Sequence, residues 1–142
     1  MAKIQKQNRL RVQKDIDIPK VEKVYVAAVR EKHEEFQTED WNAYLINDRD
    51  KAIDTVLIVT RGYDDQQSTS TMRHTIKELP PQSFAKVEFL QDDVLKLNNE
   101  FSVSFFSEGK MYHKKYVFSK NSINEKALQE VPVMSKKGIL LK

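Results

Sequence analysis

Hydrophobic and polar residues alternate on both sides of a short turn in the stretch EFSVSFFSEGKMYHKKYVF. An alternation with a period of two is typical of a β-strand that buries one face. If Glu108-Gly109 is a two-residue turn, Phe105 lies opposite Tyr112 and Phe101 lies opposite Tyr116. A shift of one residue would lose both aromatic pairs, so the sequence predicts a β-hairpin with this register.

Five more short runs of β-type composition precede this hairpin and are separated by turn residues. They are Val21–Val29, Trp41–Ile46, Ile53–Thr60, Thr69–Ile76 and Ser83–Leu90. After the hairpin, Ser122 and Glu125 have the spacing of a capping box, which predicts a short helix through about Glu130 that Pro132 ends. About seven strands with a short C-terminal helix predict an all-β fold, an antiparallel β-sandwich of the immunoglobulin-like type. A partly open β-barrel is the alternative.

The 142 residues suit one compact domain, and their charge is unevenly distributed. Residues 1–14 carry five cations and no acid, residues 135–142 carry three cations and no acid, and all 21 acids lie between these segments. We therefore expect a flexible basic arm (1–14), a single acidic β domain (15–134) and a basic C-terminal tail (135–142). The five cations of the arm are Lys3, Lys6, Arg9, Arg11 and Lys14.

The sequence also predicts the cellular location of the protein. The basic start is not followed by the apolar run of about 7 to 15 residues that a signal peptide needs. The apolar runs of the predicted domain, such as Val56–Val59, are far shorter than the roughly 18 residues of a membrane helix. We expect a cytoplasmic protein without a membrane partner, and the lack of cysteine agrees with this expectation.

Several kinds of chemistry lack the residues that they require. Without cysteine the chain can form no disulfide, no thiolate zinc site, no iron–sulfur cluster and no cysteine nucleophile. Its three glycines lie too far apart for a glycine-rich phosphate loop. The three histidines, His33, His74 and His113, lack the close spacing of zinc ligands. We expect no catalytic residue, no metal site and no cofactor.

A few individual positions give sharper structural expectations. Ile53–Thr60, the most apolar run, should be a strand buried on both faces. Trp41 should be a buried anchor between the sheets, with partner contact as the alternative. His74 should be a hydrogen-bonded interior or rim residue, and Lys114 should lie near a sheet edge with its ammonium group in water. Phe106 points away from the core face, so it is either covered by the C-terminal helix or part of a contact patch.

Basic residues are the candidates for partner contact. The arm could neutralise phosphates and gain affinity from released counterions. On the last strand Lys110, Lys114 and Lys115 alternate with Tyr112 and Tyr116, a pattern compatible with base stacking. Because the acidic domain would repel a phosphate backbone, we expect contact through the arm rather than the sheet.

From these observations we expect the protein to be a non-catalytic interaction module. Its basic arm would dock onto a larger intracellular assembly of protein, or of protein with RNA. A homodimer formed through an exposed sheet edge is a further alternative.

Four segments of the sequence resemble a family of short uncharacterised bacterial proteins. They are DWNAYLIND (Asp40–Asp48), VLKLNNEF (Val94–Phe101), FFSEGK (Phe105–Lys110) and KKYVFSKNSI (Lys114–Ile123), and the resemblance covers about residues 15 to 135. It implies a self-contained domain. Some family members carry the label phenylalanyl-tRNA synthetase alpha subunit, which implies a translation-associated enzyme or accessory as the alternative function.

That alternative would need a pocket on which several of Arg61, Arg73, His74 and His113 converge. The ATP-binding motifs of a class II synthetase require an arginine-bearing segment and a glycine-rich segment that ends in arginine. Neither pattern occurs in this sequence, so no synthetase residue is carried over.

Overall fold

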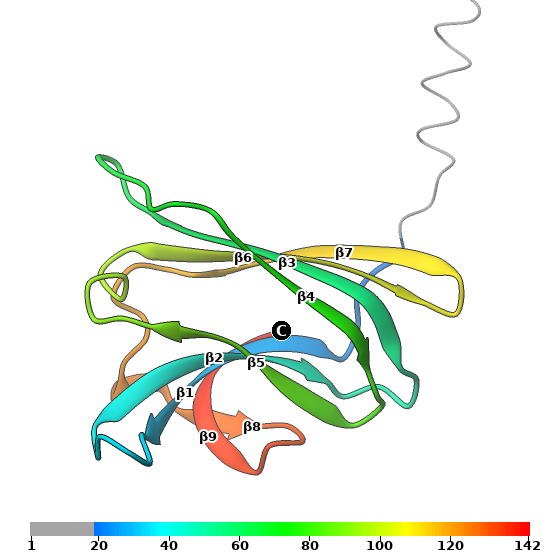
Figure 1. Cartoon of the computed structure of the whole chain (residues 1–142), viewed down its shortest axis with the longest axis horizontal. Helices are drawn as coiled ribbons and strands as arrows, with labels where there is room; N and C mark the ends of the chain where they lie inside the picture. The colour runs from blue at the N-terminus through cyan, green and yellow to red at the C-terminus, as the bar shows by residue number, and fades with distance from the viewer. Residues whose placement is uncertain (1–18) are drawn as a thin grey trace, which may run out of the picture.

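The computed structural model describes residues 19–142, which form two antiparallel β-sheets that face each other (Figure 1). One sheet has the strand order β5-β2-β1-β9-β8, and the other has the order β4-β3-β6-β7. The strands are β1 (Val24–Lys32), β2 (Glu39–Asn47), β3 (Ile53–Tyr63), β4 (Met72–Leu79), β5 (Ser83–Leu90), β6 (Asn98–Ser107), β7 (Lys110–Phe118), β8 (Gln129–Val131) and β9 (Lys136–Leu141). The predicted all-β class is confirmed, with two sandwich-like sheets rather than a closed barrel.

The chain passes several times from one sheet to the other. β1 and β2 form a hairpin in the first sheet, and β3 and β4 form a hairpin in the second. Pro80-Pro81 follows β4 and has no N–H group to continue a ladder, so the chain turns there into β5 of the first sheet. The Ser83 hydroxyl group donates a hydrogen bond of 2.6 Å to the Pro80 carbonyl oxygen and closes this turn.

The predicted hairpin is present as β6 and β7, and its register is confirmed. Phe105 lies opposite Tyr112 and Phe101 lies opposite Tyr116. β7 is the edge strand of its sheet, and the Lys114 ammonium group donates to the Lys142 carbonyl oxygen at 2.8 Å. The expectation that Lys114 lies near a sheet edge is therefore confirmed.

The main core fills the space between the two sheets. Its largest fully buried side chains come from strands of both sheets, and Leu45, Ile53, Ile58, Leu90, Phe101 and Phe105 are among them. Trp41 belongs to this cluster and is buried, as expected. β3 buries only one face, however, because Ile58 points into the core while the neighbouring Leu57 is 37% exposed. The prediction of a strand buried on both faces is wrong.

The C-terminal region differs from the expected helix and tail. In place of a helix over 122–130, a single 3₁₀ turn spans Glu125–Ala127 and the strand β8 follows it. The turn is capped by Asn124, whose side chain accepts a hydrogen bond from the Lys126 backbone N–H, and not by the predicted box.

The predicted basic tail, 135–142, forms β9 instead. β9 pairs with β1, so the domain extends beyond the predicted boundary at residue 134. The β8–β9 hairpin folds beneath β1 and β2 (Figure 1). It buries a second apolar cluster that includes Ala27, Val29, Tyr44, Ile46, Val131, Met134 and Leu140. The apolar residues near the C-terminus therefore outweigh the charge of its lysines in deciding the structure.

Within the described part of the chain, no helix has the length and apolar composition of a membrane span.

Candidate functional site

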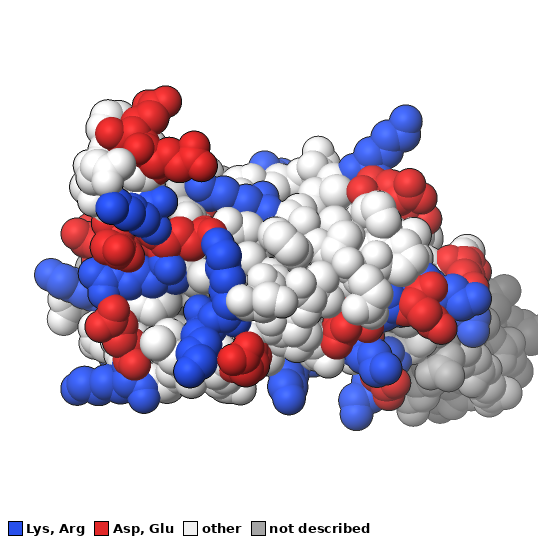
Figure 2. Space-filling model, turned by 90° about the horizontal axis from the view of Figure 1, so that it is seen from below, with Lys and Arg blue, Asp and Glu red and all other residues white. Residues whose placement is uncertain are grey.

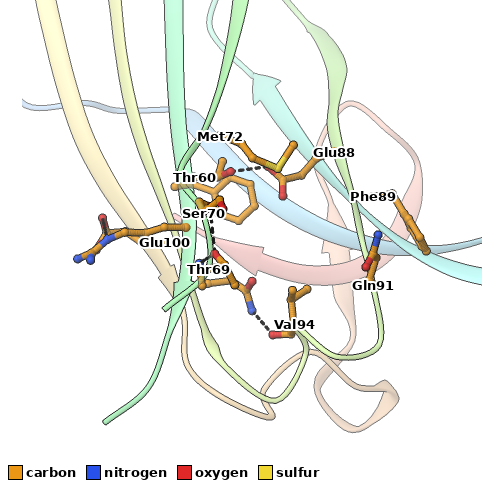
Figure 3. Close-up of a pocket in the computed structure, with 13 residues that line it drawn as sticks. Thr60, Thr69, Ser70, Met72, Glu88, Phe89, Gln91, Val94 and Glu100 are labelled. Atoms are coloured by element: carbon orange, nitrogen blue, oxygen red, sulfur yellow. Dashed lines mark hydrogen bonds and ion pairs between the residues drawn. The ribbon is translucent and has the colours of Figure 1, made fainter. Parts of the chain in front are cut away.

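A cavity of about 390 Å³ lies where the edge strands β4 and β5 of the two sheets face each other (Figure 3). It exists because β4 begins only at Met72, opposite Thr60, whereas β3 continues to Tyr63. In the loop that precedes Met72, the backbone makes one isolated β-bridge to β3, between Ser68 and Tyr63. The end of β3, the 64–71 loop and the end of β5 therefore surround an opening into the space between the sheets.

Glu88 on β5 points toward this cavity because of a β-bulge. Ala43 on β2 pairs with Glu88, but the next residue, Tyr44, pairs with Lys86, which leaves Val87 unpaired. A regular alternation would put Glu88 on the outer side with Lys86. The bulge instead turns Glu88 inward, with 16% of its side chain exposed, and turns Phe89 outward, with 47% exposed. Sequence reasoning missed this residue.

The Glu88 carboxylate joins three strands. The Thr60 hydroxyl group on β3 donates a hydrogen bond of 2.7 Å to Glu88 Oε1, and His74 Nε2 on β4 lies 3.0 Å from the same oxygen. An ionised Glu88 carboxylate accepts this hydrogen bond when His74 carries its proton on Nε2. Among the described residues, the other oxygen, Oε2, has no hydrogen-bond partner. The expected hydrogen-bonded rim position of His74 is confirmed.

The rest of the cavity wall is mixed in polarity. Met72, Val94 and Phe101 supply apolar surface, and Figure 3 shows Thr60, Met72 and Glu88 close together at one end. At the other end the Thr69 hydroxyl group accepts a hydrogen bond of 2.8 Å from the Gly62 backbone N–H. The cavity thus combines a carboxylate with an apolar wall, which suits recognition of a small amphipathic group.

Glu100, the other acid that lines the cavity, directs its carboxylate to the outer face of the four-stranded sheet, where it is already paired. Arg61 Nε lies 3.2 Å from one of its oxygens, and Lys115 Nζ lies 3.7 Å from the other. The hydrogen bond and charge of Glu100 raise the pKa of Arg61. Glu100 therefore has two cationic partners, whereas His74 is the only basic partner of Glu88 among the described residues.

The arrangement fits binding better than nucleophilic catalysis. In a serine-type triad the histidine stands between the hydroxyl group and the carboxylate, where it removes the hydroxyl proton. Here the Thr60 hydroxyl group and His74 both bond directly to Glu88. In residues 19–142, no three His, Asp or Glu side chains gather as metal ligands.

The predicted contact residues on β7 do not form one surface. Lys115 lies on the outer face of its sheet beside Glu100, and Lys110 is exposed at the turn. Lys114 lies on the side of the strand opposite Lys115, and its ammonium group donates to the Lys142 carbonyl oxygen. The five arm residues, Lys3, Lys6, Arg9, Arg11 and Lys14, lie outside the described residues.

The tyrosines of β7 face the interior and do not form a platform for stacking bases. Tyr116 is buried, and its hydroxyl group donates to the Val24 carbonyl oxygen at 2.5 Å. Burial raises the pKa of Tyr116. Tyr112 stacks on Phe105 with ring centroids 5.0 Å apart. Because successive side chains of a strand point to opposite faces, Lys115 lies on the face opposite the rings of Tyr112 and Tyr116.

The residues that the enzyme alternative needs do not converge. Arg61 and His113 lie on the outer face of the four-stranded sheet, where His113 contacts the Ser104 hydroxyl group at 2.8 Å. His74 lies on the opposite, inner face of that sheet. Phe106 is 39% exposed, and no C-terminal helix is present to cover it.

No protein-family model matches the chain, and no curated protein matches it.

Proposed function

We propose that this protein is a non-catalytic interaction module that docks onto a larger assembly through its basic segment, residues 1–14. The partner surface is anionic, and RNA within a protein assembly is the anion that we would test first. We propose the cytoplasm as the location of this interaction.

The distribution of charge carries this proposal. Residues 1–18 hold five of the 24 cations and two of the 21 acids, which leaves 19 of each in residues 19–142. The described domain is therefore neutral, and several of its cations face its own carboxylates. Figure 2 shows Lys and Arg mixed with Asp and Glu on the face seen from below, with no continuous basic stripe. The uncompensated positive charge belongs to residues 1–14.

We further propose that the domain is related to the immunoglobulin-like sandwiches. The chain alternates between the two sheets, with hairpin β1–β2, hairpin β3–β4, strand β5 and hairpin β6–β7 in turn. β5 lies beside β2 and β6 lies beside β3, as in the Greek-key connections of that fold. β8 and β9 extend this arrangement beyond seven strands.

The experiment measures binding of a short, fluorescein-labelled single-stranded RNA by fluorescence anisotropy. The full chain is compared with a chain in which all five arm cations are replaced by glutamine. For five phosphate contacts, the slope of log K against log salt should be about −3.5 for the full chain between about 50 and 200 mM salt. It should approach zero for the neutralised chain.

The matched control replaces two exposed domain cations, Lys110→Gln and Lys115→Gln. We expect this double variant to bind as the full chain does, because the domain is neutral and Lys115 already faces Glu100. Equal RNA binding by the neutralised arm variant would contradict the proposal. Loss of binding in the Lys110 and Lys115 variant alone would assign the contact to the sheet and contradict it as well.

A further inference from the structure

We propose that the cavity between β4 and β5 binds a primary ammonium group at Glu88, carried either by a free alkylamine or by a lysine side chain. This site is separate from residues 1–14, so it goes beyond the proposed function and does not depend on it.

The Glu88 oxygen that has no partner among the described residues is open to a hydrogen-bond donor of a ligand. Thr60 and His74 both bond to Oε1, which leaves Oε2 without a partner among the described residues. A carboxylate has about four acceptor positions, and a mostly buried one is stabilised by each donor that it gains. An ammonium group supplies three N–H donors together with a positive charge, and such charge-assisted bonds are the stronger class.

The charges around the cavity leave Glu88 as the available anion. Glu100 faces Arg61 and Lys115, and the Arg61 guanidinium group also lies 4.6 Å above the Tyr63 ring. Within the described residues, His74 is the only basic side chain in hydrogen-bond contact with Glu88. Glu88 therefore faces no Lys or Arg side chain among the described residues, and its Oε2 is open to a cationic ligand.

The wall of the cavity indicates the rest of the ligand. Met72, Val94 and Phe101 would pack against a short alkyl chain. The volume of about 390 Å³ is within the range of roughly 300 to 1,000 Å³ that ligand pockets show. A bare Mg²⁺ or Ca²⁺ ion fits less well, because either takes about six or more oxygen ligands and one carboxylate oxygen is free here.

The bulge at Val87 is the feature that builds this site. On a regular strand Glu88 would point into water at no cost, and Phe89 would join the core. The bulge reverses both positions and brings the carboxylate to the edge of an apolar interior. Bulges are over-represented beside binding and active sites, where they redirect a side chain.

The test titrates the full chain with n-pentylammonium and, separately, with pentan-1-ol, and follows backbone amide resonances by NMR. We expect the amine to shift resonances of Thr60, Met72 and Glu88 with a Kd of about 1 mM. The alcohol, which lacks the charge, should bind at least roughly tenfold more weakly. Equal binding of the alcohol, or no binding of the amine, would overturn the proposal.

A second titration with the peptide acetyl-Gly-Lys-Gly-amide distinguishes the two sources of the ammonium group. Tighter binding of the peptide than of pentylammonium would assign the site to a lysine of a partner protein. Tighter binding of pentylammonium would assign it to a free amine. Both results support recognition of the ammonium group at Glu88.

The variant Glu88→Gln keeps an oxygen acceptor for Thr60 and removes the charge. It should weaken amine binding at least roughly tenfold. The matched control is Glu78→Gln on β4, an exposed position that does not line the cavity, and it should leave the Kd within about twofold. Unchanged binding by Glu88→Gln would overturn the proposal.

A further variant keeps the test decisive if Glu88→Gln does not fold. Ser70→Trp, at an exposed position on the cavity rim, would fill part of the cavity without altering a buried group. It should weaken amine binding at least roughly tenfold, because the indole ring would occupy space that the bound amine needs. Full binding by this variant would place the amine elsewhere and overturn the proposal.

Discussion

Glu31, near the end of β1, connects the β1–β2 hairpin with the start of β9. Its carboxylate accepts hydrogen bonds from the Asn42 amide at 3.0 Å, from the Tyr44 hydroxyl group and from the Lys136 ammonium group. Burial alone would raise the pKa of Glu31, but the bonds from Lys136, Tyr44 and Asn42 outweigh it and lower this pKa. The pKa of Tyr44 is raised, first by burial and then by Glu31.

A lowered pKa in the folded state makes Glu31 a source of acid-sensitive stability. Its contribution is fully present above the pKa of Glu31 in the unfolded chain and is lost as the pH falls through the lowered pKa of the folded state. Glu31→Gln should therefore lower the free energy of unfolding by about 1 kcal/mol at neutral pH. At pH 3 the difference from the unchanged protein should largely vanish.

Urea denaturation at both pH values measures this effect. Glu130→Gln, at an exposed position on β8, is the matched control and should change the free energy of unfolding by less than about 0.5 kcal/mol at either pH. If Glu31→Gln lowered the free energy of unfolding equally at neutral and acid pH, the charge of Glu31 would not be the source of the stabilisation.

The roles of individual acids were the part of the candidate site that the sequence could not supply. The alternation of Ala85, Val87 and Phe89 predicts that Glu88 points outward, since nothing local marks the bulge. The bulge arises from the pairing of β5 with β2, which is distant in the chain. His74 and Lys114 could be placed correctly, because each interrupts an apolar face and must therefore reach a partner or water.

Among the elements, β9 shows how packing overrides charge. Its sequence, KKGILL, combines two lysines with an apolar run, and the lysines remain exposed while Ile139 and Leu140 are buried. Gly138 permits this packing because a Cβ atom there would lie 2.5 Å from the Ala28 carbonyl oxygen of β1. The basic charge was visible in the sequence, but the close approach of two backbones was not.

The substitution Gly138→Ala tests that close approach. The added methyl group would force β9 away from β1, so we expect a loss of about 1–3 kcal/mol in the free energy of unfolding. Lys137→Ala, one residue earlier and exposed, should change it by less than about 0.5 kcal/mol. Denaturant unfolding of both variants compares the two values. Equal stability of Gly138→Ala and the unchanged protein would mean that β9 does not pack closely on β1.

For the whole molecule, the local hydrophobic pattern predicted where most strands lie in the sequence, but it did not predict how the strands are divided between the two sheets. The β6–β7 register follows from residues close in sequence, and it was predicted correctly. The pairing of β3 with β6 and of β1 with β9 depends on contacts between distant segments. An apolar run such as Ile53–Thr60 is consistent with burial on one face or two, and only the position of β3 in the four-stranded sheet decides between them.

Adjacent positions of β3 give the most direct test of this two-sheet arrangement. Ile58 lies between the sheets, so Ile58→Ala removes buried surface and leaves a cavity, which should cost about 2–5 kcal/mol of unfolding free energy. Leu57 faces outward and is 37% exposed, so Leu57→Ala should cost less than about 1 kcal/mol. Thermal and urea unfolding of the two variants measure the contrast. Similar large losses at both positions would mean that a further layer covers the outer face of β3, as expected for a strand buried on both sides.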